Sequence, residues 1–182
     1  ARLRIFERAD VFDFRAFGLL LLTQQNNWQR PVRWGRLRSL PQGAGVLMTV
    51  KLRSEDTDGA YSMFEDWLPP AAVPPLHTLT GEHEAMYVLE GEVHAQFGEQ
   101  TFDLKPGMLL HMPLGVPHGF KNVTAEPARM MLTYAPGGFE KLFLEFGKPA
   151  KRGDTTPAVF TKEEVQRAIA AAEKYGVYRG RK

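Results

Sequence analysis

Short apolar segments dominate the middle of the chain, and glycine or proline separates most of them. Several segments alternate between apolar and polar residues, as half-buried strands do. Gly91, Gly98 and the pair Pro106-Gly107 stand at three of the breaks. Short segments at this spacing are typical of an all-β sandwich or barrel. The predicted strands cover residues 45–52, 61–68, 84–90, 92–97, 101–104, 108–112, 118–123 and 129–134.

One β-barrel over residues 45–136 accounts for all of these strands. The proline-rich stretch 69–75 resembles a linker, but we interpret it as a loop, because the strands on both sides of it are needed to close one barrel. The break at Glu90-Gly91-Glu92 predicts a hairpin, since glycine supplies the positive φ that such turns need.

The pattern changes to a helical period in residues 137–182. Thr161 followed three residues later by Glu164 is a capping-box signature, and Gly176 stands where a helix of this length ends. Before it, large apolar residues recur with the spacing i, i+3, i+4 and i+7: Phe139, Leu142, Phe143 and Phe146. We expect two helices that lie against the barrel and cover its outside.

Residues 1–44 show no clear period. They contain too many large aromatic residues for a disordered arm: Phe6, Phe12, Phe14, Phe17, Trp28 and Trp34. We expect an N-terminal extension that packs on the barrel or on a partner subunit.

Composition narrows the classes of function. The chain has 182 residues and a net charge of +2, so it lacks the strongly basic balance of a nucleic-acid-binding domain. It contains no cysteine, which excludes disulfides, thiol catalysis and thiolate-bound metals. The aliphatic run at 19–22 is too short to cross a membrane, and acidic residues precede it. We expect a cytoplasmic protein with no membrane partner.

All five histidines lie between residues 77 and 118. In the strand 84–90, period two places Glu84 on the same face as Met86 and Val88, where a carboxylate needs a partner. The same period turns His94 outward and points His83 away from Glu84. The pattern around His111 leaves its side undecided.

The two remaining histidines lie in recognisable motifs. The stretch 107–122 contains, at fixed spacing, Gly107, Pro113, Gly115, His118 and Asn122. It closely resembles the second conserved motif of the cupin superfamily. The stretch PLHTLTGEHEAMYVLEGE resembles the first cupin motif, with His77, Glu84 and Gly91 in register. The resemblance implies a cupin (double-stranded β-helix, or jelly-roll) barrel with flanking C-terminal helices.

One position departs from the family pattern. The usual first motif is His-x-His, with both histidines binding a metal, but here Leu79 occupies the second position. The resemblance then implies a metal site of His77, Glu84 and His118. Two imidazoles and one carboxylate form the set used by non-haem Fe(II) oxygenases. Iron is the expected metal, with Mn, Ni or Zn as alternatives, and the loss of one ligand implies weak binding or none.

The segment from Ala135 to Glu140 and the final helix resemble single-domain cupins of the quercetin-dioxygenase-like kind. The resemblance covers about residues 60–180. It implies a metal-dependent oxygenase acting on a small cyclic or enolic molecule, with Glu84 also deprotonating the substrate. We expect an apolar pocket around that site, and its candidate lining residues are Met86, Val88, Phe120 and Met131. The family also implies a homodimer.

Two alternatives remain open. A degenerate cupin would bind a small molecule, or hold a dimer together, without chemistry; Leu79 is the main support for it. An isomerase, epimerase or cyclase on the same barrel is the other, because one fold hosts many reactions.

Overall fold

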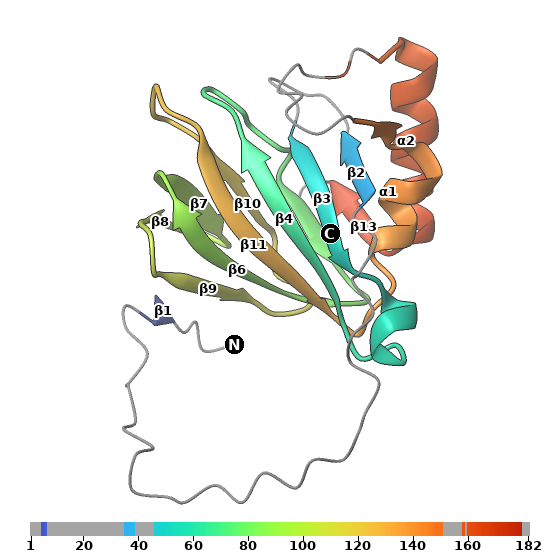
Figure 1. Ribbon diagram of the computed structural model, residues 1–182, viewed down its shortest axis with the longest axis horizontal. Coiled ribbons are helices and arrows are strands. Elements are labelled where there is room, and N and C mark those ends of the chain that lie inside the picture. Colours follow the sequence, from blue (N-terminus) through green and yellow to red (C-terminus); the bar gives the residue numbers. More distant parts are fainter. Residues whose placement is uncertain (1–4, 7–34, 39–45, 151–157, 159, 180–182) are drawn as a thin grey trace, which may run out of the picture.

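Two antiparallel β-sheets form the body of the protein (Figure 1). The computed structural model describes residues 5–6, 35–38, 46–150, 158 and 160–179. The first sheet has the order β1 (Ile5–Phe6), β9 (Leu109–Met112), β6 (His83–Glu90), β11 (Ala128–Ala135), β4 (Ser62–Leu68), β3 (Leu47–Leu52), β2 (Gly35–Arg38) and β12 (Lys148–Pro149). The second has the order β13 (Val177–Arg179), β5 (His77–Leu79), β10 (His118–Lys121), β7 (Val93–Phe97) and β8 (Gln100–Leu104). The expected all-β fold class is confirmed.

Alternation along the strands builds the core between the sheets. In β4 and β11, buried positions alternate strictly with more exposed ones. Because successive side chains point to opposite faces of a strand, every second residue enters the core. Phe64, Met86, Val93 and Leu132 are among the core side chains that are fully buried. The same alternation places the polar residues of the site among them.

The turn at Gly91 does not form the predicted hairpin. The two strands that it joins, β6 and β7, lie in different sheets: β6 pairs with β11 and β9, whereas β7 pairs with β10 and β8. Gly91 has a φ of +74°, as predicted, but a Cβ atom there would come within 2.8 Å of the Cα atom of Ala128. Glycine is needed because the chain crosses between layers against another backbone. The hairpin forms one strand later, at Gly98 between β7 and β8.

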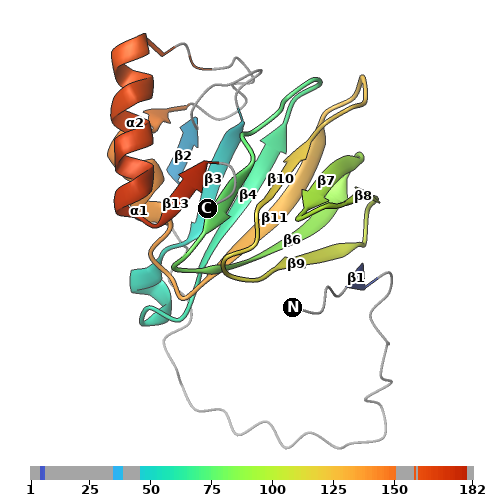
Figure 2. The ribbon, with the colours of Figure 1, turned by 180° about the vertical axis from the view of Figure 1, so that it is seen from behind.

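Both predicted helices are present. Helix α1 covers Glu140–Phe146, and α2 covers Lys162–Lys174 with Thr161 as its N-cap and the expected capping box. Gly176 follows the C-cap of α2 with a φ of +74°. Figures 1 and 2 place both helices at the side of the sheets where β2 and β13 lie. Neither described helix has the length and apolar character needed to cross a membrane.

The two terminal segments also supply strands. Residues 5–6 pair with β9 and residues 35–38 pair with β3, while the other residues of the segment 1–44 lie outside the described part of the chain. In the C-terminal segment, β13 joins β5 and places Arg179 opposite His77. The short strands β5 and β13 carry too few residues for alternation to reveal them.

Candidate metal centre

Three strands bring His77, Glu84 and His118 together in the interior. His118 on β10 pairs directly with His77 on β5, so their side chains lie next to each other in one sheet. Glu84 comes from β6 in the other sheet and meets them across the core. One ligand atom from each side chain lies within 4.8 Å of the others. Within the described residues, no other group of three His, Asp or Glu side chains is this compact.

The contacts within this cluster are short and buried. His118 Nε2 lies 3.0 Å from Glu84 Oε2, and His77 Nε2 lies 3.9 Å from the same oxygen. The two imidazole rings have their centroids 4.5 Å apart. The side chains of Glu84 and His118 are fully buried, whereas His77 is 15% exposed. His77 is therefore the member of the cluster that an incoming molecule would meet first.

Backbone carbonyl groups orient both imidazoles in the same way. His77 Nδ1 is 3.0 Å from the carbonyl oxygen of Pro75, and His118 Nδ1 is 2.7 Å from that of Val116. A carbonyl oxygen only accepts hydrogen bonds, so each Nδ1 carries the proton. Each Nε2 is then left to face Glu84, and a neutral imidazole offers a lone pair there. A hydrogen bond of this kind, which fixes the tautomer, commonly supports histidines that bind metals.

The electrostatics of the cluster favour positive charge between these groups. Burial by itself would raise the pKa of Glu84, but the contacts with His118 and His77 outweigh it and lower the pKa to about 2. Burial would lower the pKa of His118, yet the contact with Glu84 raises it above its ordinary value. A proton on Nε2 supplies that positive charge in the absence of metal, and a divalent cation would supply it otherwise.

Tyr134 is a fourth member of the cluster that sequence patterns did not identify. It lies opposite Glu84 on β11, and its hydroxyl group donates a hydrogen bond of 3.2 Å to Glu84 Oε1. Burial, followed by the charges of Glu84 and Asp66, raises the pKa of Tyr134, so the hydroxyl keeps its proton. Tyr134 thus holds the carboxylate oxygen that His118 does not contact.

Three other residues of the predicted second motif shape the backbone: Gly107, Gly115 and Asn122. Gly107 and Gly115 have φ values of +90° and +75°. The buried side chain of Asn122 donates hydrogen bonds to the carbonyl groups of Leu68 and Glu126, which ties β10 to the loop before β11. Leu79 is 1% exposed and belongs to the core, so an aliphatic contact replaces the ligand of the usual motif.

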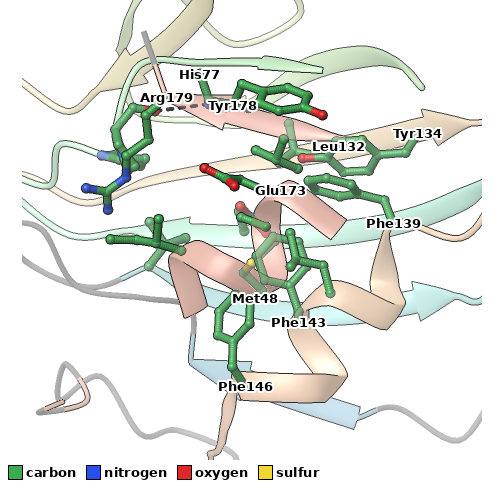
Figure 3. A pocket seen from close by; sticks show the side chains of 18 of the residues that line it. Met48, His77, Leu132, Tyr134, Phe139, Phe143, Phe146, Glu173, Tyr178 and Arg179 are labelled. Atoms are coloured by element: carbon green, nitrogen blue, oxygen red, sulfur yellow. Dashed lines mark hydrogen bonds between the residues drawn. The ribbon is translucent and has the colours of Figure 1, made fainter. Parts of the chain in front are cut away.

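An apolar pocket of about 390 Å³ reaches the cluster at His77 (Figure 3). Helix α1 contributes Phe139, Phe143 and Phe146 to its wall, and the ring of Tyr134 stacks on Phe139 at 4.1 Å. Helix α2 and strand β13 form another part of the wall. The C-terminal helices therefore line this interior pocket, which differs from the expected cover over the outer face.

The expected lining residues divide into three groups. Phe120 lines the pocket. Met86 and Val88 share the inward face of β6 with Glu84, but they are fully buried in core packing and lie outside the pocket wall. Met131 lies on the face of β11 opposite Leu132 and Tyr134, which do line the pocket. Met131 is therefore not among the residues that line this pocket.

The other three histidines lie outside the cluster. For His94 and His83, the alternation of the strands predicted the correct face. His94 is partly exposed and contacts Asp103 at 2.7 Å. His83 is the first residue of β6 and is exposed, as expected for a side chain that points away from Glu84. His111, whose side was undecided, stacks on His83 with Nε2 3.3 Å from its Nδ1.

Asp66 is the second functional candidate that sequence patterns did not identify. It lines the pocket from β4, and it is 2% exposed. The alternation of β4 was the available signal, because it puts Asp66 on the same face as Phe64 and Leu68.

Comparison with known proteins supports the same fold. Residues 66–134 match the family described as cupin domain. A germin-like protein 1 from Brassica napus is 31% identical over 84 residues, which cover 43% of this chain and 41% of that protein. The chain therefore spans less than half the length of this curated relative.

Two solved structures share the architecture. A predicted oxalate decarboxylase from Thermotoga maritima superposes with a TM-score of 0.53 and 22% identity, over 59% of this chain and 96% of the other. KdgF from Halomonas sp. superposes with a TM-score of 0.50 and 13% identity, over 58% and 91%. These two matches show the jelly-roll fold, and the cupin-domain match over residues 66–134 supports the expected superfamily.

Proposed function

We propose that this chain, which has the cupin jelly-roll fold, is an enzyme that uses a divalent transition metal to act on a small organic molecule. The observation that carries the proposal is the convergence of His77, Glu84 and His118 within 4.8 Å, next to an apolar pocket that His77 lines. The donor set fits such a metal, because two imidazole nitrogens and one carboxylate oxygen are common ligands of Fe, Mn, Ni and Zn.

The bound metal would polarise an oxygen atom of the substrate as a Lewis acid. The chain itself supplies an apolar wall that would orient the substrate. The phenyl rings of Phe143 and Phe146 on α1 form part of this wall, and His77 is the partly exposed ligand that faces the pocket. Glu84 is the candidate base that would deprotonate the substrate, and the hydroxyl group of Tyr134 orients its Oε1 atom.

We further propose an oxygenase acting on a cyclic or enolic substrate, with iron as the first metal to test. The two-histidine, one-carboxylate set is the one found in non-haem Fe(II) oxygenases. Aromatic walls that include Tyr134, Phe139 and Phe143 suit a planar ring. The structure from Thermotoga maritima that shares this fold is described as a predicted oxalate decarboxylase, which is consistent with an enzymatic role for such a barrel.

Elemental analysis of the purified protein tests the metal. We expect close to one transition metal per chain and loss of it in His118→Ala. The matched control is His94→Ala, which removes an imidazole from the outer surface and leaves the metal content unchanged. If the wild-type protein holds no metal and takes up none on reconstitution, the enzymatic proposal is refuted.

One observation favours a second function, the binding of a small molecule without catalysis. Glu84 and His118 already form a hydrogen bond of 3.0 Å, so the cluster can exist as a satisfied buried pair. Leu79 occupies the usual place of a further ligand and is packed into the core.

The substitution Leu79→His separates the two functions. In a working centre a further imidazole raises the affinity for metal, and we expect at least a tenfold change in a competition titration against a chelator. If the protein only binds a small molecule and has no working metal centre, the affinity of Leu79→His for metal stays low. The control Leu79→Met keeps the volume of the apolar side chain and adds no imidazole.

We also propose a homodimer. In the described part of the chain, the outermost strands of each sheet have a neighbouring strand on one side only, and strands at a sheet edge can pair with a second copy. Light scattering after size exclusion is expected to give twice the chain mass of 20.5 kDa. A mass equal to one chain rules the dimer out.

A further inference from the structure

Asp66 is a buried acid in the pocket wall that the metal centre does not use. It is 2% exposed, and its Oδ1 atom has no hydrogen-bond partner among the described residues. A buried polar atom without a partner costs about 1–3 kcal/mol, so a fold that keeps one needs another reason for it. A ligand in the pocket supplies such a reason.

Within the described part of the chain, no ion pair joins Asp66 to a cation. Its cross-strand neighbours are Met48 on β3 and Met130 on β11, both apolar. The cations Lys51 and Arg129 bind Glu65, which points to the opposite face of β4. Burial, followed by repulsion from Glu84 and Glu65, raises the pKa of Asp66 well above its ordinary value.

Burial distinguishes Asp66 from other charged groups in the pocket wall. Glu173 and Arg179, which also line the pocket, are exposed and can exchange hydrogen bonds with water. His77 is committed to Glu84 and to the carbonyl group of Pro75. Asp66 therefore offers hydrogen-bonding capacity that water does not satisfy.

We propose that the buried carboxyl group of Asp66 donates a hydrogen bond to a carbonyl or enol oxygen of a ring-shaped ligand held in this pocket. The inference rests on the proposed function in one respect, that the ligand occupies the pocket beside His77. The aromatic wall takes the ring, and Asp66 selects for an oxygen acceptor. A protonated amine on the ring is disfavoured, because it would need a charged aspartate.

Ligand binding to the metal-free protein tests this directly. The full chain is treated with a chelator and titrated with tropolone, 3-hydroxyflavone and 2-naphthylmethylamine, with binding followed by fluorescence or calorimetry. We expect at least one of the two oxygenated probes to bind and the amine to bind at least tenfold more weakly.

Two variants identify the interacting group. Asp66→Asn keeps a neutral donor of the same size, and we expect its dissociation constant to stay within about threefold of wild type. Asp66→Ala removes the donor without adding bulk, and we expect binding to weaken about tenfold, or about 1.4 kcal/mol. Thermal unfolding of both variants checks that they are folded.

The outcomes are distinct from those of the metal experiment. The inference is overturned if the amine binds best, if Asp66→Ala binds the oxygenated probes as wild type does, or if none of the probes binds. A protein that lacks metal but shows the expected ranking of probes refutes the enzyme and keeps the role of Asp66. A protein that holds metal but does not show this ranking of probes refutes the role of Asp66 and keeps the proposed enzyme.

Discussion

Glu84 and Asp66 are both buried carboxylates on inward-facing positions of the same sheet, yet their surroundings are opposite. Glu84 lies beside two imidazoles and a tyrosine hydroxyl, and its pKa falls to about 2. Asp66 lies between two methionines, and its pKa is raised. Burial disfavours the charged form of both groups, so the difference comes from the partners within reach. Burial alone therefore does not predict the charge of a carboxylate in this core.

Removing the carboxylate of Glu84 is expected to have the largest effect. Glu84→Ala leaves His118 and the hydroxyl of Tyr134 buried without their partner, which costs about 3–5 kcal/mol of unfolding free energy. Urea denaturation of the metal-free protein measures the loss. Tyr134→Phe, which removes one hydrogen bond and keeps the ring, is the control and should cost about 1 kcal/mol. Equal effects of the two substitutions would contradict the central position of Glu84.

The pH dependence of the metal-free protein is expected to show the second largest effect. The pKa of Glu84 is lowered from 4.5 to about 2, so its stabilisation is present above pH 4.5 and lost as the pH falls towards 2. This loss amounts to about 3 kcal/mol. The pKa of His118 is raised from 6.5, so its stabilisation is present below pH 6.5 and lost as the pH rises through the higher folded value.

Together the two groups stabilise the fold most between about pH 4.5 and 6.5. Unfolding free energies measured at intervals of one pH unit, with a chelator present, test this range. In Glu84→Gln both slopes should shrink. A profile of the wild-type protein that stays flat from pH 3 to 8 would contradict the charged cluster.

Asp66 is expected to act on stability in the opposite direction and more weakly. Its raised pKa means that the folded state holds the proton longer than the unfolded state, so stability falls as the pH rises above 3.8. Asp66→Asn cannot ionise and should be more stable than wild type at pH 8, by about 1–3 kcal/mol, with a smaller gain at pH 4. A variant less stable than wild type at both values would mean that Asp66 has a cationic partner.

The exposed pair of His94 and Asp103 is expected to give the smallest effect. The contact of 2.7 Å is as close as the one in the buried cluster, but the Asp103 side chain is 70% exposed. Water competes for both groups, so Asp103→Asn should change the unfolding free energy by less than about 1 kcal/mol. A loss comparable to that of Glu84→Ala would show that contact distance, and not burial, sets these energies.

Much of the candidate centre could be predicted from residues alone. The spacing of glycine, proline and asparagine around His118 marked it, and alternation placed Glu84 on the inward face of β6. The same alternation in β4 pointed to Asp66, but its apolar neighbours gave no reason to pair it with a distant site. Tyr134 could not be found this way, because its contact with Glu84 spans 50 positions of the chain.

The sequence by itself determined, to within a few residues, the positions of both helices, of β3 and β4 and of the strands from β6 to β11, since alternation, capping residues and glycines with positive φ act over a few residues. Only the tertiary structure decided that β6 and β7 lie in different sheets and that the C-terminal helices line the pocket. It also decided which buried carboxylate meets imidazoles. Those outcomes depend on how segments that are far apart in the chain lie in space. The packing of the whole core sets these positions, and no local sequence pattern encodes them.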